Sequence, residues 1–209
     1  MLHDRQRVID ALTEAGVEGA DEFGHFVNNT AYFAPSAFDE RAAMPVLLRL
    51  LPNLADANVV GDVAGYLRRP WARPEAFEVL VAAYRRFGVR NEKSSGWHLG
   101  DALVNAASAA DLDVLLELAQ DTRFGSSRQM LVDGLWRFRK DARVGPVLAR
   151  LCAQPGVALH AMSAYRRTVG NETALPLLRS LVEHEDELVR KQATQQTKKA
   201  EKAASAQRA

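Results

Sequence analysis

The chain has 209 residues, of which 47% are hydrophobic and 25% are charged, and its formal net charge at pH 7 is +1. This composition is ordinary for a folded protein and excludes a chain that is disordered throughout. The single cysteine excludes an intrachain disulfide, and no stretch reaches the roughly 18 apolar residues of a membrane span. We therefore expect a cytoplasmic protein.

Charge is distributed unevenly along the chain. Residues 1–40 hold eight Asp and Glu against two Arg, whereas the residues after Gly125 hold 15 Lys and Arg against eight Asp and Glu. Such a gradient can orient a partner or favour head-to-tail association. The alternative is a solvated surface on which charge is merely uneven.

Residues 1–38 predict an N-terminal helical cap. Residues 2–15 place apolar side chains on one side of a helix, and Gly16 is a natural stop. Residues 20–29 predict a short second helix in an aromatic-rich segment, and a loop then ends at Pro35. An atypical first element is the usual way in which an array of repeats covers its apolar end.

From Asp39 onward, one apolar phrase rich in leucine occurs five times. The phrases begin at residues 45, 78, 113, 146 and 176, so their spacings are 33, 35, 33 and 30 residues. A period of this size is typical of stacked supersecondary units. Each phrase predicts the first helix of a hairpin with a buried stripe, and the predicted stripes are Leu47/Leu50/Leu51, Leu80/Ala83/Tyr84, Leu115/Leu118/Ala119, Leu148/Leu151/Cys152 and Leu178/Leu181/Val182. The candidate N-caps are Asp39, Ser108 or Asp111, Asp141 and Asn171.

The second helices of the five hairpins can be aligned with one another on their apolar positions. These helices contain Val60, Leu99, Leu131, Leu159 and Val189 as their first apolar anchors. Residues 88–95 predict a longer loop inside the second hairpin. We expect residues 39–197 to form one array that makes a single domain with the cap, and residues 198–209 to form a basic, frayed tail.

The last hairpin contains Asp-Glu-Leu-Val-Arg-Lys-Gln-Ala at residues 186–193. With paired helices of about 30 residues, this segment resembles the HEAT and short HEAT-like (phycobilisome-lyase-type) repeats over residues 39–197. Only this hairpin keeps the Val-Arg pair, because the earlier ones have Gly61, Gly100, Val132 and His160 in place of the Arg. The resemblance implies an all-α, right-handed α-solenoid of about five hairpins, whose second helices line a concave side and usually bind other proteins. It implies no one reaction.

The polar positions of the second helices form the candidate site. In the order of the hairpins they are Asp62 and Tyr66, Asp101 and Asn105, Asp133 and Arg137, Ala161 and Tyr165, and Lys191 and Gln195, with Trp97, His98, Trp136 and His160 nearby. We expect a protein or peptide partner to contact Asp62, Tyr66, Trp97, Asp101, Asn105, Asp133, Trp136, Arg137 and Tyr165, since aromatic residues beside charges are typical of binding hot spots. The alternative is that the charges pair on a wet surface and that the tryptophans fill gaps between hairpins.

The sequence also contains residues that could serve a different kind of site. Clustered arginines would form a phosphate-binding strip, although cations at helix C-termini also complement the helix dipole without a ligand. Trp97 and Asp101 lie one turn apart, which is similar to the Trp and Asp of HEAT-like DNA glycosylases for alkylated bases, and Arg137 could face them. No phosphate-binding loop, Ser/His/Asp arrangement or metal-ligand motif is present in the sequence, and Cys152 is predicted to be buried. We expect a non-enzymatic protein-binding scaffold or adaptor without a cofactor or metal; the alternative is a nucleic-acid-binding or DNA-repair protein of the glycosylase type.

Overall fold

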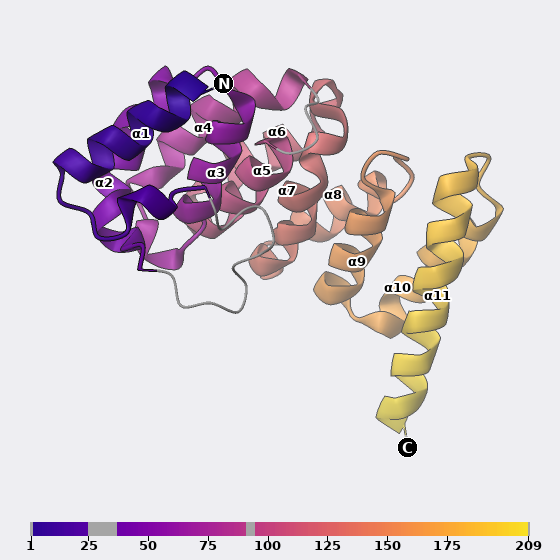
Figure 1. Ribbon diagram of the computed structural model, residues 1–209. Helices are drawn as coiled ribbons and strands as arrows, with labels where there is room; N and C mark the ends of the chain where they lie inside the picture. The colour runs from indigo at the N-terminus through magenta and orange to yellow at the C-terminus, as the bar shows by residue number, and fades with distance from the viewer. Residues whose placement is uncertain (1, 25–36, 91–94, 209) are drawn as a thin grey trace. The chain divides into compact units, whose positions relative to one another are not determined.

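The computed structural model describes residues 2–24, 37–90 and 95–208, and every regular element in these ranges is helical (Figure 1). The predicted all-α class is therefore confirmed. The chain divides into two compact units, Met1–Ala107 and Ser108–Ala209. None of the helices in these ranges has both the length and the apolar character that crossing a membrane requires.

The first unit contains five α-helices joined by short 3-10 turns within the described ranges. They are α1 (Leu2–Glu14), α2 (Glu40–Leu50), α3 (Ala57–Leu67), α4 (Ala76–Phe87) and α5 (Ser95–Ala106), with η1 (Ala20–Glu22), η3 (Leu51–Asn53), η4 (Pro70–Ala72) and η5 (Gly88–Arg90). The pairs α2/α3 and α4/α5 correspond to the first two predicted hairpins. Residues 91–94 of the predicted loop lie outside the described residues.

The core of the first unit follows the predicted stripes. Leu47, Leu51, Leu80 and Tyr84 are fully buried, because the apolar face of each first helix packs against its neighbours. Asp39 confirms its predicted role as N-cap: its carboxylate accepts from the backbone N–H groups of residues 41 and 42, each at 3.0 Å. Local sequence therefore accounts for both the start and the buried face of α2.

The predicted cap is only partly helical. Its first helix is α1, as expected, but the second helix predicted over residues 20–29 is a single 3-10 turn, η1, within the part that the structure describes. The rest of that segment, residues 25–36, lies outside the described residues. Gly19 has a φ of 69° at the start of η1, and a Cβ there would meet the backbone N of Phe38 at 2.5 Å. This close approach requires glycine.

Two charged side chains attach α1 to α3. Asp4 accepts hydrogen bonds from the backbone N–H groups of Ala55 and Asp56 at 2.7 and 2.8 Å, beside the start of α3. Arg5 Nη2 lies 2.5 Å from Asp62 Oδ2 in the middle of that helix. The backbone bonds lower the pKa of Asp4 below its ordinary value, because they favour the ionised carboxylate. The N-terminal helix is therefore fixed onto the second helix of the first hairpin.

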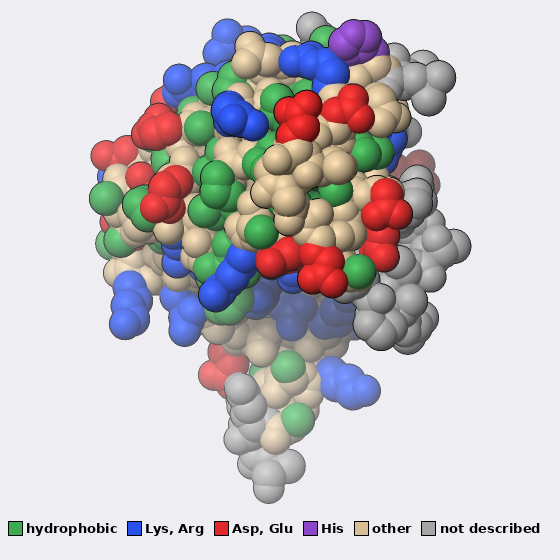
Figure 2. Space-filling model, turned by 60° about the vertical axis from the view of Figure 1, so that its left-hand side comes forward, with side chains coloured by type: hydrophobic (Ala, Val, Ile, Leu, Met, Phe, Trp, Pro, Cys, Tyr) green, Lys and Arg blue, Asp and Glu red, His purple; other side chains and the backbone are tan. Residues whose placement is uncertain are grey.

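The face that carries α1 and α2 contains much of the acidic segment, residues 1–40. Figure 2 shows acidic side chains there interspersed with basic and apolar ones, without a single continuous acidic patch. On this face, the uneven charge of the sequence is consistent with a solvated surface.

The second unit contains six α-helices in the described ranges. They are α6 (Leu112–Gln120), α7 (Gln129–Gly134), α8 (Val144–Leu151), α9 (Ala158–Val169), α10 (Asn171–Ser180) and α11 (Glu187–Arg208), with η6 (Ala109–Asp111), η7 (Thr122–Arg128), η8 (Leu135–Phe138) and η9 (Leu181–Glu183). Ser108 and Asp111 form a capping box on η6, whereas Asn171 is the first residue of α10, after Gly170 at the N-cap, and its side chain accepts from Arg166 Nε at 3.0 Å. The N-cap prediction for Asn171 is therefore wrong.

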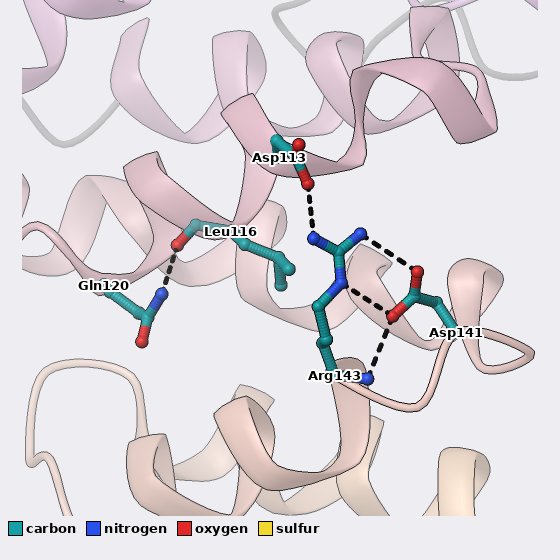
Figure 3. Close-up of polar contacts among 5 residues, drawn as sticks. All are labelled: Asp113, Leu116, Gln120, Asp141 and Arg143. Atoms are coloured by element: carbon teal, nitrogen blue, oxygen red, sulfur yellow. Dashed lines mark hydrogen bonds and ion pairs between the residues drawn. The ribbon is translucent and has the colours of Figure 1, made fainter.

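Long-range polar contacts within each unit recur at about one repeat length. Arg143 Nη1 of α8's N-cap lies 2.5 Å from Asp113 Oδ1 of α6, 30 residues earlier (Figure 3). The same guanidinium bonds both carboxylate oxygens of Asp141 at 3.0 Å, so one arginine joins two successive first helices. Arg150 Nη2 donates to Gln120 Oε1 at 2.7 Å, again 30 residues apart. The starts of α6 and α8 are therefore joined by one contact and their ends by another, so these two helices run side by side in the same direction.

The end of the chain differs from the predicted tail. The helix α11 continues to Arg208, and Ala200 and Ala204 are buried along it. Arg179 of α10 pairs with Glu201 of α11 at 2.8 Å. Alanine has the highest helix propensity and needs little space, so these positions continue the packed face where larger apolar anchors are lacking.

Candidate functional site

The first pair of predicted site residues, Asp62 and Tyr66, lies inside the first unit. Each is only 5% exposed. The Tyr66 hydroxyl accepts a hydrogen bond from the Gly24 N–H at 3.3 Å, and its ring centroid lies 4.7 Å from that of Phe38. Burial raises the pKa of the Asp62 carboxyl above its ordinary value, although Arg5 opposes the effect. The structure corrects the placement of both residues: Asp62 holds Arg5 of α1, Tyr66 packs against Phe38 and the segment around Gly24, and neither is part of the candidate site below.

The second pair, Asp101 and Asn105, is half-buried on α5 and makes contacts within the first unit. Asp101 Oδ2 lies 3.7 Å from Arg68 Nη1, and Asn105 Nδ2 donates to Asp101 Oδ1 at 3.1 Å. Arg73 Nε donates to the Asn105 backbone carbonyl at 2.6 Å. The carboxylate of Asp101 therefore lies beside a cation and accepts from an amide of the same unit.

Trp97 precedes this pair on the same helix. It is half-buried, and its ring packs edge-on against His98 with centroids 5.2 Å apart. Burial lowers the pKa of His98, and Arg68 lowers it further. The imidazole is therefore neutral at pH 7 and fills space beside the tryptophan rather than carrying charge.

The third pair is different, because its aspartate belongs to a partly exposed cluster in the second unit. Arg167 of α9 has its guanidinium carbon 3.7 Å from the centroid of the Trp136 ring. The same guanidinium lies 3.3 Å from Asp133 Oδ2 on α7. The side chains of Arg167 and Asp133 are 43% and 25% exposed, so solvent reaches both partners. One arginine therefore combines a cation–π contact with an ion pair at the surface.

Two further residues complete this group. Arg139 also approaches Trp136, with its guanidinium carbon 5.3 Å from the ring centroid. Burial lowers the pKa of His160 below its ordinary value, although nearby Asp133 opposes this shift. Because the pKa is lowered overall, the imidazole is neutral at pH 7. We call Asp133, Trp136, Arg139, His160 and Arg167 the Trp136 cluster. The predicted residue Arg137 is exposed and lies next to Trp136 in the sequence.

The fourth pair lies on another face of α9. Ala161 is fully buried, and Tyr165 is half-buried. Burial raises the pKa of Tyr165, with a smaller contribution from Cys152. Tyr165 is therefore close enough to Cys152, which follows α8, for the two groups to interact, and it is not part of the Trp136 cluster.

The sequence reasoning missed Arg139 and Arg167 as site residues. It placed the arginines of this region at helix C-termini, where they complement the helix dipole. A usable signal was present, because Arg167 follows Asp133 by 34 residues, which is about one repeat length. Opposite charges one repeat apart are in position to pair between parallel helices.

Neither a metal-binding cluster nor an activated thiol is found in the part of the chain that the structure describes. Within residues 2–24, 37–90 and 95–208, no three His, Cys, Asp or Glu side chains lie close enough together to hold a metal ion. Burial raises the pKa of the Cys152 thiol to about 12, so this cysteine is not an activated nucleophile. The Trp136 cluster offers an aromatic face, two guanidinium groups and one carboxylate.

Comparison with known proteins adds no family to this description. No protein-family model, curated protein or solved structure matches the chain.

Proposed function

We propose that the chain is a non-enzymatic protein-binding scaffold or adaptor of the cytoplasm, built as a right-handed solenoid of HEAT-like hairpins. In this proposal the Trp136 cluster contacts a protein or peptide partner. The fold supports the proposal because first and second helices of the predicted hairpins follow one another through each unit. In the second unit, side chains about one repeat length apart in the sequence also form ion pairs, as Arg143 does with Asp113 and Arg167 with Asp133. Arrays of this kind present extended surfaces to partners.

The observation that carries the proposal is the position of Arg167. Its guanidinium is held over Trp136 and beside Asp133, yet it is 43% exposed. Tryptophan and arginine are enriched in hot spots, and an arginine that is already ordered loses less conformational freedom on binding. An incoming carboxylate could share the guanidinium, while an apolar side chain packs against the ring.

The nucleic-acid alternative has less support. Two arginines that would form a phosphate strip on the second unit are already paired: Arg143 with both Asp113 and Asp141, and Arg167 with Asp133. Exposed pairs of this kind reduce the positive charge that phosphates would meet. The glycosylase comparison is weakened in the same way, because Asp101 lies beside Arg68.

The proposal is tested by capture from the native host with matched variants of the full chain. Arg167→Gln removes the cation of the Trp136 cluster, whereas Arg179→Gln removes an exposed, ion-paired arginine of the same unit that lies outside it. We expect a protein that is retained by the wild type and by Arg179→Gln to be lost from Arg167→Gln, with unchanged helicity in both. Equal retention by all three proteins would exclude the cluster, and retention of nucleic acid that disappears with added salt would favour the alternative.

A further inference from the structure

A groove runs between α9 and α11 in the second unit, apart from the Trp136 cluster. It has a volume of about 480 Å3 and is lined by Leu159, Leu188, Lys191, Gln192, Thr194, Gln195 and Lys198. None of these seven residues belongs to the Trp136 cluster. Leu188 is 49% exposed, which is unusual for a large apolar side chain in the described part of this chain. The groove therefore offers apolar surface to a ligand.

The packing of the two helices explains why the groove is open. Arg166 Nη1 of α9 donates to Gln196 Oε1 of α11 at 2.6 Å, and Gln196 is only 3% exposed. Val189 and Ala193 of α11 are fully buried, so that side of the helix is used by the core. Leu188, Lys191, Gln195 and Lys198 are spaced by three, four and three residues, so they share a different side of α11.

Charge indicates what kind of ligand fits this groove. Its lining includes two lysines and no acidic residue. The helix α11 as a whole carries six Lys and Arg against two Glu. Lys191 and Lys198 lie seven residues apart, which places them about 10 Å apart along the helix axis. An extended basic and apolar strip of this length matches two turns of an acidic amphipathic helix.

One polar atom in the lining also lacks a hydrogen bond. Gln192 Oε1 is buried and has no hydrogen-bond partner. A buried acceptor without a donor is costly, but this atom has almost no accessible surface, so a ligand in the groove does not reach it directly. Apolar contact and two cations are thus the features that the groove offers to a ligand along one stretch of α11.

We propose that the groove between α9 and α11 docks an acidic amphipathic helix of a protein partner. Leucine or isoleucine side chains at helical spacing pack between Leu159 and Leu188, and Asp or Glu side chains that flank them pair with Lys191 and Lys198. This is the helix-in-groove mode of recognition, in which a few apolar anchors supply affinity and charges select the ligand. The groove's apolar floor favours a helix over nucleic acid, whose outer surface is charged phosphate.

The test is a titration of the full chain, labelled on its leucine methyl groups, with a synthetic helix of about five turns that carries leucines on one face and glutamates beside them. We expect the NMR signals of the Leu159 and Leu188 methyls to shift on binding. The variant Lys191→Gln/Lys198→Gln should bind on the order of fivefold more weakly, since each exposed ion pair contributes modestly. The matched variant Lys199→Gln/Lys202→Gln removes two exposed charges of α11 that do not line the groove and should bind like the wild type.

Four outcomes would overturn the proposal. The first is that the peptide leaves both methyl signals unmoved, and the second is that the two double variants weaken binding equally, which indicates attraction to net charge alone. The third is that the signals shift with protein concentration before any peptide is added, which identifies a second copy of the chain as the occupant. The fourth is that a DNA duplex shifts them more than the peptide does. A peptide whose glutamates are replaced by glutamine is the control for charge, and it should bind more weakly to the wild type.

Discussion

Replacing Arg5 by methionine should destabilise the first unit much more than replacing its partner Asp62 by asparagine. Methionine keeps most of the apolar stem of arginine but removes the cation 2.5 Å from the Asp62 carboxylate. Asparagine keeps the shape of aspartate but removes its charge. The two variants break the same ion pair from opposite sides, and the structure predicts different costs.

The difference comes from unequal burial of the two partners. The side chain of Asp62 is 7% exposed and that of Arg5 is 33% exposed. Removing one partner of a buried pair costs about 3–5 kcal/mol; because water reaches Arg5, we expect about 2–3 kcal/mol for Arg5→Met near pH 7. In Asp62→Asn the partly exposed guanidinium stays in contact with water and keeps its hydrogen bond to the Phe23 carbonyl at 3.3 Å, so the cost should stay below about 1 kcal/mol.

The pH dependence follows from the direction of the pKa shift. Burial raises the pKa of Asp62 in the folded protein even with Arg5 present, and loss of Arg5 raises it further. For a carboxyl of this kind, stability is lost as pH rises from the unfolded-state pKa of about 4 through the folded-state value. The cost of Arg5→Met should therefore be largest at neutral pH and smaller in mildly acidic buffer, where the carboxyl takes up a proton.

The assay is urea unfolding of the full chain, followed by circular dichroism at neutral and mildly acidic pH. Arg7→Met is the matched control on the same helix, because Arg7 is 41% exposed and lies 3.2 Å from Asp4; it should change the free energy of unfolding by less than about 1 kcal/mol. The reasoning would be refuted if Arg5→Met and Arg7→Met had equal effects, or if Asp62→Asn were the more harmful change at neutral pH.

Three more outcomes can be checked on the same protein. Gly19→Ala should cost about 2 kcal/mol or more and exceed Gly16→Ala, because both have positive φ but only Gly19 has backbone within 3 Å of a new Cβ; comparable urea midpoints would contradict this. Cys152, whose pKa is raised to about 12, should react with a disulfide reagent at mildly alkaline pH more than about tenfold faster after unfolding than before, and equal rates would show an exposed thiol. Leu115→Ala should cost about 2–5 kcal/mol, whereas Leu188→Ala, at a side chain 49% exposed, should stay within about 0.5 kcal/mol; similar losses would disprove the burial pattern.

The sequence alone was sufficient for the all-α class and for most of the helices. Repetition of the apolar phrase predicted the first helices α2, α4, α6, α8 and α10, because a buried stripe at helical spacing and a regular period are properties of the chain itself. The N-cap at Asp39 is equally local, since it depends on only three neighbouring residues. Burial of Cys152 also followed from its place in a stripe.

The candidate site depended on information that is not local. On α9, Ala161 is buried, whereas Arg167 is exposed beside Asp133. Successive residues turn by about 100° around a helix, so an error of one position in the alignment of two repeats exchanges a core face for a surface face. Asp62 shows the same dependence. It is buried because α1 covers it, and its partner on α1, Arg5, lies 57 residues earlier in the sequence. Periodicity determines that a helix has an apolar side; which of its polar residues remain in water is decided only by the neighbours that pack against it.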